Sequence, residues 1–141
     1  MGPMKPDDES AADGWGTDYA AALALAKKEQ KAVLADFTGS DWCGWCVRLK
    51  SEVFDTPEFE KWAAQNVVLL ELDYPQRKQL PDGLMKQNDE LARKYGIQGY
   101  PTILFFDAAG KAIGRMGYEP GGPASWTRNA QRIVDAIKAK G

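Results

Sequence analysis

Histidine is absent from this sequence of 141 residues. Since the imidazole ring is the general base of Ser-His-Asp and Cys-His mechanisms, a common metal ligand and the usual pH switch near neutrality, its absence excludes those kinds of site. The charges are nearly balanced, with 18 Lys and Arg against 20 Asp and Glu, and both signs are spread along the chain. This balance offers neither the basic field that nucleic acid requires nor a polybasic membrane patch, so we expect no nucleic-acid partner.

Long apolar runs are also missing. The longest, residues 19–26, is far shorter than the roughly 18 residues that a membrane-spanning helix needs, and no charged start followed by an apolar segment opens the chain. With 44% hydrophobic residues, the composition instead predicts one compact domain.

Cysteine occurs only at Cys43 and Cys46, which are too close in sequence to link distant parts of a fold. Two thiolates are half of a tetrahedral zinc site, and without histidine the other ligands would have to be carboxylates or come from a second chain, so we predict no metal. The chemistry that suits Cys-x-x-Cys is reversible dithiol/disulfide exchange, provided that the motif opens a helix after a strand.

The pattern of apolar residues divides the chain into an arm and a domain. Residues 1–16 are rich in Gly, Pro, Asp and Ser and are expected to form a flexible arm, apart from a short strand at Trp15. Residues 17–141 are expected to form the domain, beginning with a helix over 18–29 that Thr17 caps. The further elements expected are a strand at 32–37, a helix opened by the cysteines, a helix at 57–64, a strand at 67–73, a helix at 84–95, a hairpin of 102–106 and 111–116, and a helix at 125–140.

Two short segments in this order carry a resemblance. Trp42-Cys43-Gly44-Trp45-Cys46 follows the first long strand, and Gly99-Tyr100-Pro101-Thr102 precedes the strand at 102–106. Both resemble the signature segments of the thioredoxin superfamily. The resemblance and the order of elements predict an α/β thioredoxin-like fold, with a central mixed β-sheet flanked by helices and an N-terminal helix.

Three longer segments, 37–43, 71–76 and 115–122, resemble the DsbH-type periplasmic thiol-disulfide oxidoreductases of chlamydiae, and the similarity extends over about Trp15 to Lys138. The resemblance implies an exported, single-domain enzyme that acts reductively. It also implies disulfide-containing protein substrates and a thiol electron donor, for which a membrane protein is one candidate.

The positions of the cysteines suggest their roles. A helix N-terminus stabilises a thiolate, so Cys43 is expected to attack a substrate disulfide. Cys46, one turn further along the helix and expected to be more buried, would then resolve the mixed disulfide. The redox-active disulfide would be the only cofactor. Because Gly44-Trp45 puts no cation between the cysteines, we expect a reducing couple.

Four neighbouring residues are candidates for substrate binding. The resemblance places Pro101 opposite the cysteines as a cis-proline, where the backbone of Tyr100 would meet an extended substrate. Trp45 is expected to be exposed beside Cys43 as an apolar contact, whereas Trp42 is expected to pack beneath the site. A proline at the start of a strand can also be purely structural, and core packing is the alternative for both tryptophans.

Two aspartates allow two interpretations each. Asp36, in a strand expected to be buried, could accept the proton of Cys46, as an aspartate does in thioredoxins. However, the segment between Asp36 and Cys43 is one residue longer than in thioredoxins, which could turn this side chain to the other face; it would then be a structural residue satisfied by backbone or a cation. Asp41 could raise the pKa of Cys43 or cap the helix, and we expect the cap.

Three functions follow from these observations. The first is a monomeric thiol-disulfide oxidoreductase that reduces disulfides in exported proteins through Cys43 and Cys46. The second is a disulfide isomerase or oxidase, although isomerases usually hold substrates with an added domain or a dimer interface, for which this length leaves no room. The third is a redox-inert binding module that presents Trp45, Tyr100 and Tyr118 to a partner.

Overall fold

The computed structural model describes residues 14–140. A mixed sheet forms its centre, with the strand order β1-β3-β2-β4-β5 in the described residues. The strands are β1 (Trp15–Gly16), β2 (Ala32–Thr38), β3 (Val67–Asp73), β4 (Thr102–Phe106) and β5 (Ala112–Met116). β1, β3 and β2 are parallel, while β4 and β5 run antiparallel to their neighbours. This is the mixed α/β sheet, flanked by helices and preceded by an N-terminal helix, that the sequence predicts.

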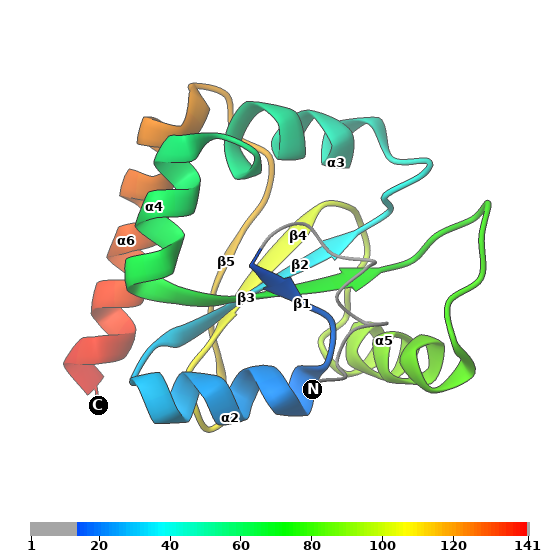
Figure 1. Ribbon diagram of the computed structural model, residues 1–141, viewed down its shortest axis with the longest axis horizontal. Helices are drawn as coiled ribbons and strands as arrows, with labels where there is room; N and C mark the ends of the chain where they lie inside the picture. The colour runs from blue at the N-terminus through cyan, green and yellow to red at the C-terminus, as the bar shows by residue number, and fades with distance from the viewer. Residues whose placement is uncertain (1–13, 141) are drawn as a thin grey trace.

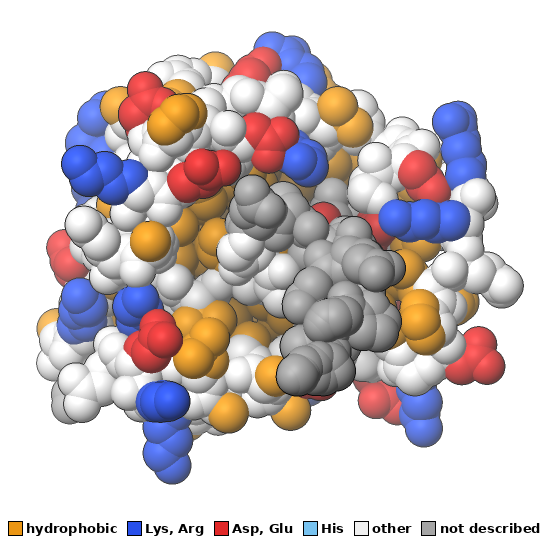
Figure 2. Space-filling model, viewed as in Figure 1, with side chains coloured by type: hydrophobic (Ala, Val, Ile, Leu, Met, Phe, Trp, Pro, Cys, Tyr) orange, Lys and Arg blue, Asp and Glu red, His pale blue; other side chains and the backbone are white. Residues whose placement is uncertain are grey.

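Helices cover both faces of the sheet, as Figure 1 shows: α2 and α5 lie on one side, and α3, α4 and α6 lie on the other. The helical segments are α2 (Tyr19–Glu29), α3 (Gly44–Leu49), the π-helical η2 (Lys50–Phe54), α4 (Pro57–Asn66), α5 (Asp82–Lys94) and α6 (Gly122–Lys140). In the described part of the chain, none of them has the length and apolar character needed to cross a membrane. The visible face in Figure 2 carries charged side chains of both signs in a scattered arrangement.

The two faces of the sheet bury separate hydrophobic clusters. In β2, Leu34 belongs to the cluster under α4 and α6, whereas Val33 and Ala35 belong to the cluster under α2 and α5. This alternation follows from the two-residue period of a strand. It means that Asp36, which has the same parity as Leu34, faces the side that carries α3.

Several boundaries differ from those predicted. The side chain of Asp18 caps α2 by accepting from Ala21 N at 3.1 Å, and Thr17 instead is buried, with no partner for its hydroxyl. Helices α5 and α6 begin two and three residues earlier than expected: α5 begins at Asp82 after the N-cap Pro81, and α6 begins at Gly122 before Pro123. Proline is compatible with the start of a helix, because the missing N–H is not needed there. Most of the arm expected at 1–16 lies outside the described residues, which begin at residue 14. Trp15 and Gly16 form β1, in agreement with the short strand expected at Trp15.

Candidate active site

The cysteines lie where β2 ends and α3 begins. The intervening turn is closed by the backbone N–H groups of Trp42 and Cys43, which both donate to the Gly39 carbonyl. Cys43 is the N-cap of α3, and its Sγ accepts from Cys46 N at 3.2 Å. The two residues form a disulfide with their Cα atoms 5.2 Å apart. The motif therefore opens a helix after a strand, as reversible disulfide chemistry requires.

The two sulfurs differ in surroundings rather than in exposure. Cys43 is 6% and Cys46 5% exposed, so both are buried and Cys46 is more buried by a very small margin only. The Sγ of Cys46 accepts from Gly39 N at 3.5 Å, at the end of the central strand β2. Cys43, by contrast, precedes the first residue of α3, where the free N–H groups of a helix favour a thiolate.

Aromatic side chains surround the disulfide. Trp45 is 54% exposed, as predicted, but Trp42 is 38% exposed and does not pack beneath the site. The Trp42 indole N–H donates to the Tyr74 carbonyl at 2.7 Å, and its ring meets Tyr100 edge to face at 5.6 Å. The peptide bond between Tyr100 and Pro101 is cis. The segment before β4 thus lies beside the Cys-x-x-Cys loop, and together they present an apolar surface.

A charged network supports Trp45, and it was not predicted. The guanidinium of Arg48 lies over the rings of both Trp45 and Tyr118, and donates twice to Glu52 at 2.9 and 3.0 Å. The Tyr118 hydroxyl donates to the other Glu52 oxygen at 2.5 Å. This bond and the pairing with Arg48 lower the pKa of Glu52. The i,i+4 spacing of Arg48 and Glu52 was visible in the sequence, whereas Tyr118 comes from a distant segment.

Asp41 does not cap α3. Its carboxylate accepts from Gln76 N and Arg77 N, both at 2.9 Å, and these bonds lower its pKa. In the same turn, Ser40 donates through N and Oγ to the Asp73 carboxylate at 2.9 and 2.5 Å. The loop that carries the cysteines is therefore fastened to the segment that follows β3. The cap expected of Asp41 is provided by Cys43, because Cys43 is the residue directly before the helix.

Asp36 is buried on the side of the sheet that carries α3. It is 8% exposed, and its Oδ1 has no hydrogen-bond partner. Asp36 shares the parity of Leu34, so its side chain faces α3 and is not turned to the face that carries α2 and α5. Burial, followed by the charges of Glu71 and Asp73, raises the pKa of Asp36 well above its usual value. Among the described residues no hydrogen bond joins Asp36 to Cys46, although Asp36 lines a cavity with Lys50, one turn after Cys46.

The geometry defines a class of protein: a thioredoxin-like fold in which the helix that follows the central strand begins at a disulfide. In the described residues, no three Cys, Asp or Glu side chains gather as a metal site would require. The chain matches the thioredoxin-like domain family over residues 19–124. It belongs to that family, and it is a thiol-disulfide oxidoreductase with Cys43 and Cys46 as its cysteine pair.

Relatives within this family are similar over most of the chain. The "Disulfide bond reductase DsbH" of Chlamydia pneumoniae is 36% identical over 122 residues, which cover 86% of this chain and 72% of that protein. The "Thioredoxin-related protein DsbJ" of the same organism is 31% identical over 103 residues, but these cover only 30% of its length. A solved structure of the "DsbH Oxidoreductase" superposes with a TM-score of 0.81 at 33% identity, covering 96% of this chain and 92% of the other. A thioredoxin from Thermus thermophilus, at 24% identity and a TM-score of 0.65, shares the fold.

Proposed function

We propose that this oxidoreductase works in the reducing direction, on disulfides in exported proteins, and that a thiol electron donor returns it to the dithiol form. The observation that carries the direction is that, within the described part of the chain, no uncompensated cation lies beside Cys43. Gly44 and Trp45 carry no charge, and Arg48, in the turn after them, is bonded twice to Glu52. A free cation would stabilise the Cys43 thiolate, and with it the reduced form, which would make the couple oxidising. The name of the similar chlamydial DsbH, a disulfide bond reductase, supports the same direction.

The reaction is two successive thiol-disulfide exchanges. The Cys43 thiolate attacks a substrate disulfide, so one sulfur of the substrate leaves as a thiolate and Cys43 becomes joined to the other. Cys46 then loses its proton and attacks Cys43. The bond from Cys43 to the substrate breaks, the Cys43–Cys46 disulfide forms, and the second substrate sulfur leaves as a thiolate. Two electrons have passed to the substrate, and an external dithiol must supply them again.

The surface around Cys43 supports protein substrates. Trp42, Trp45 and Tyr100 offer apolar area, and the backbone before the cis-Pro101 is at the edge of this area. An extended peptide can pair with such a backbone and bury its apolar side chains on the rings. We assign substrate binding to these four residues.

Asp36 is our candidate for the group that receives the proton of Cys46. Its carboxyl is buried on the face that carries α3, and its raised pKa makes it a better proton acceptor near neutral pH than an exposed aspartate. Its Oδ1 is an acceptor that no group within residues 14–140 occupies. A water molecule would have to bridge the two side chains, since they share no direct hydrogen bond.

Location and oligomeric state belong to the same proposal. The DsbH-type resemblance supports an exported protein, and we propose that it acts as a monomer. Cell fractionation of the natural host tests the location, and light scattering at micromolar concentration tests the monomer. Recovery in the cytoplasm would contradict export, and a dimer at that concentration would contradict the monomer.

The reduction potential of the Cys43–Cys46 couple, measured by equilibration with glutathione, tests the direction. Thioredoxin and the oxidase DsbA, at about −270 and about −120 mV, mark the two extremes. We expect a value near the first. A value near the second would assign the protein to oxidation or isomerisation. In parallel, reduction of insulin by the dithiol form separates an enzyme from a redox-inert binding module, which would show no turnover.

A further inference from the structure

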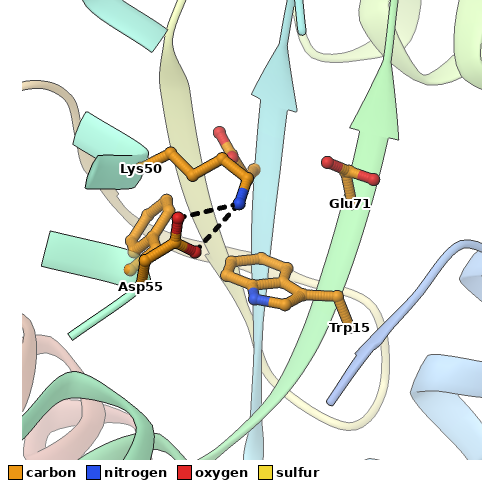
Figure 3. Close-up of a pocket in the computed structure, with 6 residues that line it drawn as sticks. Trp15, Lys50, Asp55 and Glu71 are labelled. Atoms are coloured by element: carbon orange, nitrogen blue, oxygen red, sulfur yellow. Dashed lines mark hydrogen bonds and ion pairs between the residues drawn. The ribbon is translucent and has the colours of Figure 1, made fainter. Parts of the chain in front are cut away.

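A small cavity lies next to the helix that carries the cysteines. Its volume is about 10 Å³, roughly the room that one water molecule needs. It is lined by Trp15, Asp36, Lys50, Phe54, Asp55 and Glu71. Figure 3 shows Glu71 on β3, with Lys50 and Asp55 bonded to each other nearby. The cavity therefore brings two carboxyl groups of the sheet to the same small space.

Asp36 and Glu71 are neighbours by register. They are paired residues on the parallel strands β2 and β3, whose separation is about 4.8 Å. Both side chains project to the side of the sheet that carries α3, since Leu34 and Val67, which share their parity, belong to the same hydrophobic cluster. Asp36 is nearly fully buried, whereas Glu71 is half-buried. The pair thus extends from the interior toward the surface.

The charged groups around this pair are already engaged elsewhere. Lys50, on η2, is bonded to both Asp55 oxygens at 2.9 and 3.0 Å. Asp73, the next β3 residue on this face, accepts from Ser40 and lies 3.8 Å from the Lys78 ammonium. Among the described residues no cation forms an ion pair with Asp36 or Glu71.

Two adjacent carboxylates that have no cation paired with them repel each other. One of them therefore gains a proton at a pH that is still above the usual carboxyl pKa range. Burial, with a further contribution from Asp73, raises the pKa of Glu71 to about 7, against the opposing charges of Lys78 and Lys50. Burial and the charge of Glu71 raise that of Asp36. The two groups are therefore expected to titrate as a coupled pair.

We propose that Asp36 and Glu71 form a carboxyl pair that holds one proton near neutral pH, and that Glu71 passes to solvent the proton that Cys46 releases to Asp36. This inference rests on the proposed reductive function and on the role of Asp36 in it. As Cys46 attacks Cys43, its proton moves to the pair, by way of water, while the substrate sulfur leaves as a thiolate. The proton then leaves through Glu71, the more exposed carboxyl, and the leaving thiolate takes up a proton from solvent. Glu71 is thus a positioning and relay residue for Asp36.

The test compares Glu71→Gln, Asp36→Asn and the wild type. Glu90→Gln is the matched control, because Glu90 is an exposed glutamate of α5 on the opposite face. Stopped-flow measurement of the resolving step between pH 5 and 9, started from the dithiol protein and a peptide disulfide, gives a pH profile for each. In Glu71→Gln the carboxyl inflection should move to lower pH by about one unit, because Asp36 loses its like-charged neighbour. In Asp36→Asn it should disappear, and in Glu90→Gln it should stay in place.

Carbon-13 NMR titration of the side-chain carboxyls provides a readout that does not need turnover. In the wild type, Asp36 and Glu71 should each show two linked titration steps. In Glu71→Gln, Asp36 should show a single step at lower pH. An Asp36 titration unchanged by Glu71→Gln, together with an unchanged kinetic profile, would overturn the pair while leaving the reductive function intact. Failure of the wild-type dithiol to reduce insulin would instead overturn the proposed function, whatever the titration shows.

Discussion

The guanidinium of Arg48 lies 5.1 Å from the centre of the Trp45 ring and 5.3 Å from that of Tyr118. The two rings are themselves 5.0 Å apart. Glu52 joins this arrangement by bonding to both Arg48 and Tyr118. Trp45, the exposed residue between the cysteines, is therefore held by a cation and a second ring, which limits its movement beside Cys43.

Replacing Arg48 should weaken substrate binding through Trp45. Arg48→Ala removes the cation over the ring, and we expect KM for a protein disulfide such as insulin to rise about two- to fivefold, the effect of an exposed cation–π contact. The rate with a small disulfide such as hydroxyethyl disulfide should be unchanged, because it does not reach the ring. Steady-state kinetics with both substrates measures the difference.

Arg93→Ala, at an exposed position of α5, is the matched control and should leave both rates unchanged. Arg48→Lys should fall between wild type and Arg48→Ala, because lysine keeps the charge but not the flat stacking surface. Equal loss with the large and the small disulfide would show that Arg48 acts on the cysteines rather than through Trp45.

The sequence predicted those parts of the molecule that depend on local pattern. The bounds of β3 and β4 are as predicted, as is the start of α4 at Pro57 after the Thr56 cap. The Cys-x-x-Cys motif and its place at the start of a helix were also predicted correctly. Each of these depends on a run of apolar residues or on a capping signal within a few positions.

The missed features depend on contacts between distant segments. Asp41 reads as a helix cap from its position, but its partners are the N–H groups after β3. The place of Glu71 next to Asp36 depends on the register of two parallel strands, which the sequence does not display. Tyr118 reaches Glu52 across 66 positions of the chain. The surroundings of the cysteines were therefore less predictable than the cysteines themselves.

Removing one cysteine at a time should separate the two exchange steps. In Cys46→Ala, Cys43 can still attack a substrate disulfide, but no second thiol resolves the product. The mixed disulfide between Cys43 and the substrate should therefore accumulate in nearly stoichiometric amount. Cys43→Ala should form little of it, because Cys46 lies against the end of β2. Non-reducing gels with mass spectrometry identify the linked cysteine. Equal trapping by both variants would contradict the assigned order of attack.

Asp41→Asn should loosen the connection between the cysteine loop and the segment after β3. The lowered pKa of Asp41 means that its carboxylate stabilises the fold above the usual carboxyl pKa, and that this contribution is lost as the pH falls through the lowered value. Asp41→Asn should therefore lower Tm at pH 7 and make less difference at pH 3. Asp82→Asn, on an exposed acid of α5, serves for comparison. A Tm difference that is the same at both pH values would contradict the ionic role of Asp41.

Gly39 is required by the close approach of Trp42. A Cβ at this position would lie 2.6 Å from both Cζ2 and Nε1 of the indole, so Gly39→Ala must displace the ring and break its bond to the Tyr74 carbonyl. We expect a loss of about 1–3 kcal/mol in the free energy of unfolding, measured with urea. Gly83→Ala, in α5 with open space around it, should be stabilising by about 0.5–1 kcal/mol. Equal stability of the two variants would show that Trp42 adjusts without cost.

Glu71 should make the oxidised protein less stable as the pH rises. Its pKa is about 7 in the fold against 4.5 for the ordinary group. Between these values the folded protein binds more protons than the unfolded chain, so the free energy of unfolding falls as the pH rises from about 4.5 to about 7 and does not fall further above it. The shift corresponds to about 3 kcal/mol, an upper bound because the side chain is only half-buried.

Glu71→Gln should therefore match the wild type near pH 4 and exceed its stability at pH 8. Urea unfolding of the oxidised proteins at both pH values measures the gain, with Glu90→Gln as the control. A gain that is independent of pH would mean that Glu71 titrates in the fold as it does in the unfolded chain, and that burial does not raise its pKa.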